Sequence, residues 1–531
     1  MHVPQAFDAR PRHTRPGRRS AFSPSFLCEP LSRTALCAAK PAVAPIEANH
    51  QPMKTILTIL VTLFAPLGAL TAADRQPQER PNILWLIAED AGPDFGCYGN
   101  PAARTPNIDR LAAASRVYRH AFSTASVCSA SRSALMTGVF QTRIGASHHR
   151  SHRSEGHPLP SGVKLITERM RDAGYFTANL RELPPDLGFQ GTAKTDWNFT
   201  KPAKPFDASN WSELKSHGPF FAQINLEEAH RVYHRDPIHP TDPAKVSLPP
   251  YLADDPIIRA DWAAYLDSLA ALDAKVGAVL NWLKRDGLAE NTVIFFFADN
   301  GREDFRGKYY AYEQGFNVPL LVHWPSMVAA GSTTDELVSL LDVHATTLAL
   351  AGVTADGLDG APIFGPGAKA RDHVFGARDR IDDTPDRVRT VRDARYKYIR
   401  NFKPEHPYLQ RMAYAEVTNP SYNRMRKLFA EGKLNAAQTK FMASRRPAEE
   451  LYDLQNDPFE LHNLADSPAN RATLEHLRGV LGAWLKETND ESALAEDTEE
   501  VRKQLESVER AVIAVKQKLG LKGPLLESVP E

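Results

Sequence analysis

Two short polar pairs directly follow strongly apolar runs of the sequence. Glu89-Asp90 follows one such run, and Asp299-Asn300 follows another far along the chain. Uninterrupted apolar runs are typical of strands buried on both faces of a sheet, and open α/β sheets bind ligands at the carboxyl ends of their strands. Carboxylates and an amide oxygen suit a hard cation. The two pairs together therefore predict a Ca²⁺ site, or a Mg²⁺ site, although either pair alone would suit a solvated turn.

A cysteine stands at the predicted start of a helix. Cys128 follows a loop of small residues, and the helix should end near Gly138. Ser129 or Ser131 can cap the first turn, and the unpaired N–H groups of a helix N-terminus attract anions. Arg132 adds a positive charge one turn later. This position would stabilise a negative charge at Cys128, whereas a small buried residue is the simpler interpretation.

Alternating strands and helices must position these residues. Apolar runs alternate with segments whose apolar residues recur at helical spacing, from Pro81 to about Gly360. This alternation predicts an α/β fold with a large, mostly parallel central sheet. We expect strands at 81–88, 175–180, 220–226, 292–298 and 318–324, and helices from 105 toward 117 and at 128–138, 163–173, 259–286 and 337–351.

The pattern changes beyond Arg371. A hairpin over 388–402 and a short strand at 451–454 predict a smaller antiparallel sheet packed with a helix, and a charged helix should follow over 496–519. The expected divisions are a leader at 1–73, a main catalytic domain at 74–370, a C-terminal subdomain at 371–490, and a charged helix and tail at 491–531.

The leader differs in composition from the rest of the chain. Residues 1–50 combine arginine with proline and serine and show no apolar period, which predicts disorder. The apolar run 56–70 after Met53 has the length of a signal-peptide core and is short for a membrane span. We expect Met53 to be the true start, cleavage before Asp74, and export to the periplasm or the medium. An uncleaved membrane anchor is the alternative.

Charge and cysteine content narrow the classes of function. The chain has 64 Lys and Arg residues and 64 Asp and Glu residues, so no overall charge favours nucleic acid or a membrane surface as partner. Cleavage before Asp74 would leave Cys97 and Cys128 as the cysteines of the mature chain. Export permits a disulfide between them, and the sequence leaves both this bridge and a separate fate for Cys128 open.

Several segments resemble the formylglycine-dependent sulfatases, in the order expected for that family, over roughly residues 80–465. The most specific segment is the signature that begins at Cys128. Two stretches also resemble the heparan N-sulfatase branch, namely Phe220-Phe221 and the residues around Asp299. The matching segments are Pro81 to Leu84 with Glu89-Asp90, Thr105 to Leu111, Cys128-Ser129-Ala130-Ser131-Arg132 with Leu135 to Gly138, Ala298 to Gly301, Gly307-Lys308 with Val318 to Leu320, and Leu451 to Leu454 with Asp457-Pro458, Glu460 and Asn463-Leu464.

The resemblance implies an alkaline-phosphatase-like sandwich fold and a sulfuric ester hydrolase. A separate maturation enzyme would oxidise Cys128 to formylglycine (3-oxoalanine). One hydroxyl of the hydrated aldehyde would attack sulfur and the other would later expel sulfate, which an ordinary alcohol cannot do. By matched position, the Ca²⁺ ligands would be Glu89, Asp90, Cys128, Asp299 and Asn300, and the catalytic residues Cys128, Arg132, Lys194, His230, Lys308 and Asp196.

Three positions depart from the family pattern. Glu89 replaces the usual first Asp, and its longer side chain can still reach a cation. Ala130 replaces the commoner Pro of the signature. Asp196 stands two residues after Lys194, where the family has a His that takes a proton during sulfate release. Asp196 itself, or a histidine of the 148–152 loop, must take that proton here.

A basic loop follows the Cys128 helix and should overhang its pocket. We expect His148, His149, His152 and Arg153 to bind an anionic sugar, whereas a solvated run of charge is the alternative. A sulfated carbohydrate is the expected substrate, as a sulfate ester or a sulfamate. The sequence also leaves open a phosphodiesterase or phosphonate hydrolase of the same superfold, and a non-catalytic polyanion-binding protein with unmodified Cys128.

Overall fold

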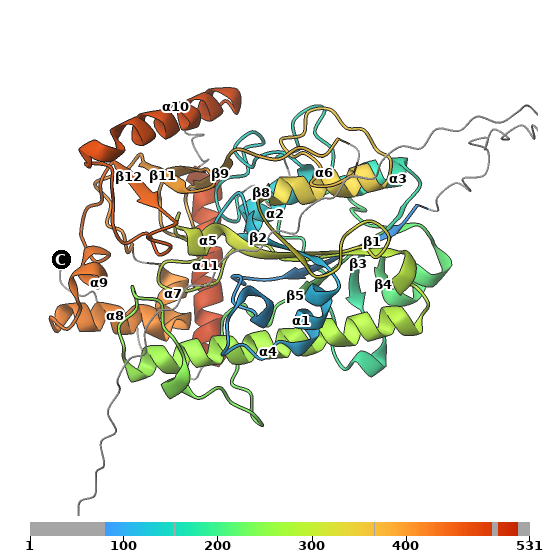
Figure 1. The fold of residues 1–531 in the computed structure, drawn as a ribbon, viewed down its shortest axis with the longest axis horizontal. Helices are drawn as coiled ribbons and strands as arrows, with labels where there is room; N and C mark the ends of the chain where they lie inside the picture. Colours follow the sequence, from blue (N-terminus) through green and yellow to red (C-terminus); the bar gives the residue numbers. More distant parts are fainter. Residues whose placement is uncertain (1–79, 152–155, 366, 411, 491–497, 519–531) are drawn as a thin grey trace, which may run out of the picture. The chain divides into compact units, whose positions relative to one another are not determined.

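A computed structural model describes residues 80–151, 156–365, 367–410, 412–490 and 498–518 (Figure 1). The expected leader and its cleavage site, together with His152 and Arg153, lie outside the described residues, and the expectations for them stay predictions. In the described part of the chain, no helix has both the length and the apolar character needed to cross a membrane.

The main sheet has eight strands, in the order β4-β3-β5-β1-β6-β7-β2-β8. All its pairings are parallel except those of β7, which runs antiparallel to both β6 and β2. The predicted α/β fold with a large, mostly parallel sheet is confirmed. The strands are β1 (Asn82–Ala88), β2 (Arg116–Phe122), β3 (Phe176–Glu182), β4 (Ala208–Asn210), β5 (Phe220–Leu226), β6 (Thr292–Ala298), β7 (Asn317–His323) and β8 (Ser332–Ser339).

Strand β1 lies between β5 and β6, and the three strands end at the same level. Ala88, the last residue of β1, pairs with both Leu226 and Ala298, the last residues of its neighbours. Every residue of these strands is buried, which explains their continuous apolar sequences. The residues that follow the three strands therefore share one edge of the sheet.

Helices cover both faces of this sheet (Figure 1). On one face, the backbone N–H groups of Asn107 and Ile108 in α1 donate to Asp273 of α4 at 2.9 and 2.7 Å. On the other, Trp85 of β1 donates from its indole to Thr347 of α6 at 3.0 Å. The helices of these layers are α1 (Pro106–Ala113) and α4 (Pro256–Arg285), and α2 (Cys128–Thr137), α3 (Ile166–Asp172) and α6 (Leu340–Leu350).

The second sheet is antiparallel, in the order β12-β11-β10-β9, as predicted. Helix α10 packs on it, because Trp484 stacks on Phe375 with ring centroids 5.1 Å apart. Its strand β9 also reaches the loop before α2, where the N–H of Ala377 donates to the carbonyl of Thr124 at 2.9 Å. The elements are β9 (Val374–Arg378), β10 (Val388–Arg392), β11 (Tyr396–Asn401), β12 (Glu449–Asp453), α7 (Ala413–Thr418), α8 (Pro420–Ala430), α9 (Ala436–Lys440), α10 (Arg471–Glu487) and α11 (Thr498–Lys518). The division expected at residues 370 and 371 stays a prediction.

Several details differ from the sequence predictions. The first helix ends at Ala113, and the chain then forms β2, whose exposed and buried residues gave no clear strand signal. The helix expected from Leu337 begins at Leu340, because β8 occupies the preceding residues. The first turn of α2 has no side-chain cap. Its end at Gly138 is as predicted, with a left-handed φ of 74°, and a Cβ there would lie 2.7 Å from His344.

Candidate active site

Four polar side chains gather where β1 and β6 end. Asp90, Asp299 and Asn300 are fully buried, and Glu89 is almost so. The Asn300 amide donates to Asp90 Oδ1 at 3.0 Å, and Asp299 Oδ1 accepts from the backbone N–H groups of Asp90 and Asn300 at 3.2 and 2.9 Å. The matched register of the two strands thus brings together the side chains that the sequence predicted as one group.

Three cationic side chains surround this group of acids. Arg132 Nε donates to Asp299 Oδ2 at 2.8 Å, Lys194 Nζ to Glu89 Oε2 at 2.8 Å, and Lys308 Nζ to Asp90 Oδ2 at 2.6 Å. Arg132, Lys194 and Lys308 come from α2, from the loop after β3 and from the loop after β6. The acids and the bases are therefore held as buried ion pairs rather than as solvated turns.

The pKa of Asp90 shows how nearby positive charges offset the effect of burial on these acids. Burial alone would raise it, but the positive charges of Lys308 and His230 outweigh burial and hold the pKa well below its usual range. The pKa of Glu89 is also lowered: burial opposes ionisation, and Lys194 and Arg132 favour it more strongly. Both carboxyl groups are anionic at neutral pH.

One oxygen of the group has no protein partner. Asn300 Oδ1 is buried and accepts no hydrogen bond from the described residues. Its own amide nitrogen is fully used, since it donates to Asp90 Oδ1 and to the carbonyl of Gly301. A buried amide oxygen without a donor costs free energy unless a ligand satisfies it. Beside three carboxylates, this orphaned oxygen fits a hard divalent cation.

Cys128 is the first residue of α2 and is buried. Its Sγ lies 3.3 Å from Asp196 Oδ2 and 3.6 Å from His149 Nε2. On its far side the His149 ring contacts Asp382 Oδ1 through Nδ1 at 2.8 Å. A carboxylate can only accept, so Nδ1 carries a proton and Nε2, when the ring is neutral, faces the sulfur as an acceptor. Cys97 and Cys128 are both free thiols, so the alternative disulfide is not formed.

The basic loop does lie over the start of α2. The backbone N–H of Arg150 donates to Ser129 Oγ at 2.9 Å. His148 precedes His149 in the sequence. Its Nδ1 accepts a hydrogen bond from the backbone N–H of Arg380 at 3.3 Å. It lines a cavity of about 420 Å³ that also includes Arg380 and Lys403. Of the two predicted loop histidines that the structure describes, His149 therefore contacts the thiol and His148 lines this cavity.

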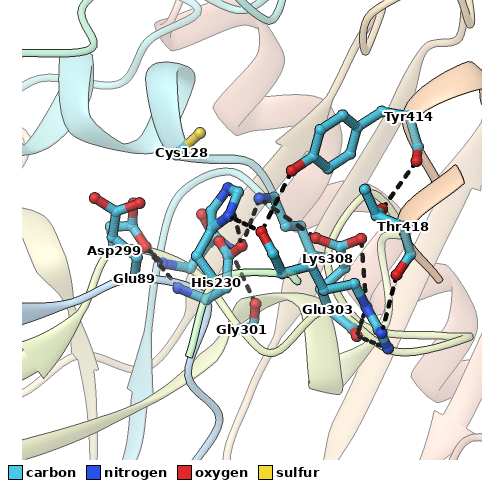
Figure 2. A network of polar contacts seen from close by, with 12 residues as sticks. Glu89, Cys128, His230, Asp299, Gly301, Glu303, Lys308, Tyr414 and Thr418 are labelled. Atoms are coloured by element: carbon cyan, nitrogen blue, oxygen red, sulfur yellow. Dashed lines mark hydrogen bonds and ion pairs between the residues drawn. The ribbon is translucent and has the colours of Figure 1, made fainter. Parts of the chain in front are cut away.

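A second group of side chains lies around Lys308 (Figure 2). His230 Nε2 is 3.7 Å from Asp90 Oδ2, and Nδ1 contacts the carbonyl of Arg231 at 2.7 Å. Glu303 Oε2 is 3.9 Å from Lys308 Nζ. The ring of Tyr414 in α7 is 6.3 Å from that of His230, in an edge-on arrangement.

Comparison with known proteins decides the family. The sequence model of the family described as "Sulfatase" matches residues 81–353, which is half of the chain. The chain belongs to the sulfatase family. A second match, "N-sulphoglucosamine sulphohydrolase, C-terminal", covers residues 301–412. The protein is therefore a sulfuric ester hydrolase by descent, as the resemblance implied.

Relatives of this sulfatase act on several substrates. An "Ulvan-active sulfatase" of Formosa agariphila is 32% identical over 80% of this chain and 78% of its own. Human "N-sulphoglucosamine sulphohydrolase" is 28% identical over 78% of this chain and 92% of its own. Human "Arylsulfatase A" is 30% identical over 79% of this chain and 89% of its own.

Solved structures share the fold at lower identity. A protein in complex with its substrate D-glucosamine-2-N,6-O-disulfate superposes with a TM-score of 0.57, at 17% identity, over 78% of this chain and 99% of that one. A phosphonate monoester hydrolase from Silicibacter pomeroyi superposes with a TM-score of 0.53, at 17% identity, over 77% of this chain and 96% of that one. The predicted alkaline-phosphatase-like sandwich is thus the fold of this sulfatase.

Three polar residues of the pocket were missed by the sequence reasoning. Glu303 follows Asp299 in the same loop, and this short spacing was the one local signal for it. Asp382 and Tyr414 come from the C-terminal part of the chain, and no motif points to either. Both carboxylate oxygens of Glu303 are buried without a hydrogen bond from the described residues, and its burial raises its pKa above the usual range.

The contact between Asp382 and His149 predicts a pH-dependent contribution to stability. Burial would raise the pKa of Asp382, but His149 outweighs it and the pKa is depressed. A depressed carboxyl pKa stabilises the fold above the unfolded value of about 4, and the contribution is lost as the pH falls through the folded value. At pH 7, Asp382→Asn should lower the free energy of unfolding by about 1–3 kcal/mol.

Urea unfolding of both proteins at a series of pH values checks this prediction. The difference between them should shrink as the pH falls below about 4. Asp372→Asn, at an exposed carboxylate, is the matched control and should change stability by less than about 0.5 kcal/mol. A difference that grows as the pH falls below about 4 would contradict the assignment.

Proposed function

We propose that this sulfatase releases sulfate from a sulfated carbohydrate, using formylglycine made from Cys128 and a Ca²⁺ ion held at the end of the central sheet. The observation that carries the proposal is the position of Cys128, on a helix start and within a shell of Arg132, Lys194 and Lys308. Such a shell suits the anionic sulfate group of an ester. The named activities of the relatives support a carbohydrate as the carrier of that sulfate.

Glu89, Asp90, Asp299 and Asn300 would hold the cation, with residue 128 completing the set. When bound, Ca²⁺, or Mg²⁺ in its place, supplies positive charge that polarises the sulfate ester. Formylglycine supplies a hydrate with one hydroxyl to attack sulfur and a second through which sulfate is later expelled. A formylglycine-generating maturation enzyme is therefore a required partner.

Arg132, Lys194 and Lys308 bind and orient the sulfate. Each already contacts a carboxylate of the metal group, so their ammonium and guanidinium groups are fixed before substrate arrives. Fixed donors stabilise charge that develops in the transition state without having to reorganise. The buried surroundings strengthen this effect because water does not screen the charges.

His230 and Lys308 lie where a leaving group can be protonated. His230 Nε2 and Lys308 Nζ both contact Asp90 Oδ2, at 3.7 and 2.6 Å, and Figure 2 shows the two side chains next to each other. A proton donor beside the departing oxygen or nitrogen makes it a better leaving group. The Tyr414 hydroxyl donates to the carbonyl of Arg231 at 3.4 Å, the same carbonyl that His230 Nδ1 contacts.

His149 takes the role for which the sequence left two candidates. Asp196 and His149 both contact Cys128 Sγ, but Asp382 orients His149 so that Nε2 faces the sulfur. A neutral imidazole near pH 7 accepts a proton more effectively than a carboxylate with its low usual pKa. We therefore assign proton removal on the nucleophile side to His149 and the orientation of the site to Asp196.

A sulfamate is the second candidate substrate. The match of residues 301–412 to the C-terminal domain named for N-sulphoglucosamine sulphohydrolase favours it. The same pocket would release an amine, and His230 would protonate the departing nitrogen. His148, with His152 and Arg153 of the same loop, remains our candidate for contacts to the anionic sugar. Export to the periplasm or the medium, after loss of the 1–73 leader, would bring the enzyme to such polymers.

Mass spectrometry and sulfate release test the proposed function together. Protein made with a maturation enzyme should show the Cys128 peptide about 18 Da lighter than the thiol form, and should release sulfate from one member of a panel of sulfated and N-sulfated disaccharides. Cys128→Ala should lose at least about 10³-fold in kcat/KM, whereas Cys97→Ser should keep it. Cleavage of phosphonate esters alone, or full activity of Cys128→Ala, would contradict the proposal.

Separate variants test the assignment of the proton acceptor. His149→Gln should lower kcat by about 10²–10⁴-fold and abolish the acidic limb of its pH profile, because the accepting imidazole is lost. Asp196→Asn should lower kcat less and keep that limb. Peptide mass spectrometry must first show equal conversion of residue 128 in each variant. If Asp196→Asn loses the limb and His149→Gln keeps it, Asp196 is the acceptor.

A further inference from the structure

The thiol form of the site contains a second set of metal donors, distinct from the all-oxygen group. Cys128, His149 and Asp196 are all buried, and their Sγ, ring nitrogen and carboxylate oxygen lie within 4.8 Å of one another. Thiolate and imidazole are ligands that zinc and similar transition metals prefer, whereas Ca²⁺ takes oxygen ligands. The two sets therefore differ in the class of cation that they suit.

Two of the three donor-atom distances are close to those of tetrahedral zinc coordination. Zn–S bonds of about 2.3 Å and Zn–N bonds of about 2.0–2.1 Å place these two donor atoms about 3.6 Å apart. Sγ of Cys128 and Nε2 of His149 are 3.6 Å apart. Sγ and Oδ2 of Asp196 are 3.3 Å apart, which a small rotation of the thiol would widen. Three protein ligands would leave the fourth position for water.

A supporting contact for such a site is already in place. Metal-binding histidines usually donate their second ring N–H to a carboxylate, which fixes the ring and directs the other nitrogen at the metal. His149 makes this contact with Asp382 at 2.8 Å. Asp382 is buried and has a left-handed φ of 47°, so a tight turn holds the carboxylate in position behind the ring.

The charges around the three donors also permit a dication. Arg132, Lys194 and Lys308 lie nearby, and each is paired with a carboxylate of the oxygen group. Lys194 Nζ also lies 3.9 Å from Asp196 Oδ2, so a zinc ion would replace this longer contact. A thiolate and the Asp196 carboxylate would together neutralise a doubly charged ion. Binding would release the thiol proton of Cys128 to solvent, without oxidation or reduction of any group.

We propose that the unconverted protein binds Zn²⁺ through Cys128, His149 and Asp196, and that conversion of Cys128 removes the site. The zinc site depends on the thiol form alone, whereas its loss on conversion rests on the proposed function. Zinc binding and maturation are thus competing fates of one cysteine.

The test uses full-length protein from a host without the maturation enzyme, after mass spectrometry shows an unmodified Cys128. The protein is stripped with chelator, supplied with excess Ca²⁺ to fill the oxygen group, and titrated with Zn²⁺ against a chromophoric chelator. Co²⁺ serves as a spectroscopic substitute. We expect one ion per chain and, with Co²⁺, a thiolate-to-metal charge-transfer band together with the visible bands of a tetrahedral ion.

Variants assign the ligands. Cys128→Ser should lower the association constant for Zn²⁺ by at least about 100-fold and remove the charge-transfer band. Asp382→Asn should lower that constant by about 10–100-fold, as loss of a supporting carboxylate does in other zinc sites. Cys97→Ser is the matched control, because it removes the other described thiol, and should leave the constant and the spectrum unchanged.

The wild-type spectrum decides the proposal even if a variant does not fold. Absence of stoichiometric binding, a cobalt spectrum without the charge-transfer band, or a band that Cys97→Ser abolishes would overturn it. Converted protein that binds Zn²⁺ as tightly as the thiol form would overturn the claim of competition. Failure of converted protein to release sulfate would contradict the proposed function and leave the zinc result standing.

Discussion

The structure depends on keeping several buried carboxylates ionised at one edge of a sheet. Because β1 and β6 end at the same level, Glu89, Asp90 and Asp299 are forced close together, away from water. Like charges at this spacing repel one another, and burial alone would raise the pKa values of Glu89 and Asp90. Arg132 and Lys308 are two of the cations that prevent this, and they come from α2 and from the loop after β6. The fold therefore brings distant elements together in order to balance charge, and a divalent cation at the orphaned amide oxygen would complete that balance.

The mechanism that we propose assigns different tasks to two groups of side chains beside these acids. In the first group, Cys128 contacts His149 and Asp196. In the second, His230 and Lys308 both contact Asp90. The family usually has a His where this chain has Asp196. Here an imidazole reaches the same thiol from the loop after α2, oriented by a carboxylate from the C-terminal part of the chain. An imidazole therefore lies beside this thiol although position 196 itself is an aspartate.

The sequence predicted the parts of this arrangement that are encoded locally. Buried strands such as β1 and β6 are continuous apolar runs, so their ends, and the acids that follow, could be located. Strand β2 directly follows a helix, and its buried residues come in pairs rather than alternating with exposed ones. The first half of β8 is polar. For these reasons neither strand was recognised. The pairing of His149 with Asp382 joins residues far apart in the chain. Asp382 lies in a turn with an unremarkable sequence, and only the packed structure reveals its partner.

The central claim is that the oxygen group at the end of β1 and β6 holds a cation beside residue 128. A high-resolution crystal structure of the converted protein, grown with Ca²⁺, tests it directly. We expect a single ion about 2.3–2.6 Å from oxygens of Asp90, Asp299 and Asn300, and from the hydrated residue 128. An Asn300 Oδ1 that instead accepts a hydrogen bond from water or a side chain, with Lys308 and Arg132 alone balancing the acids, would contradict it.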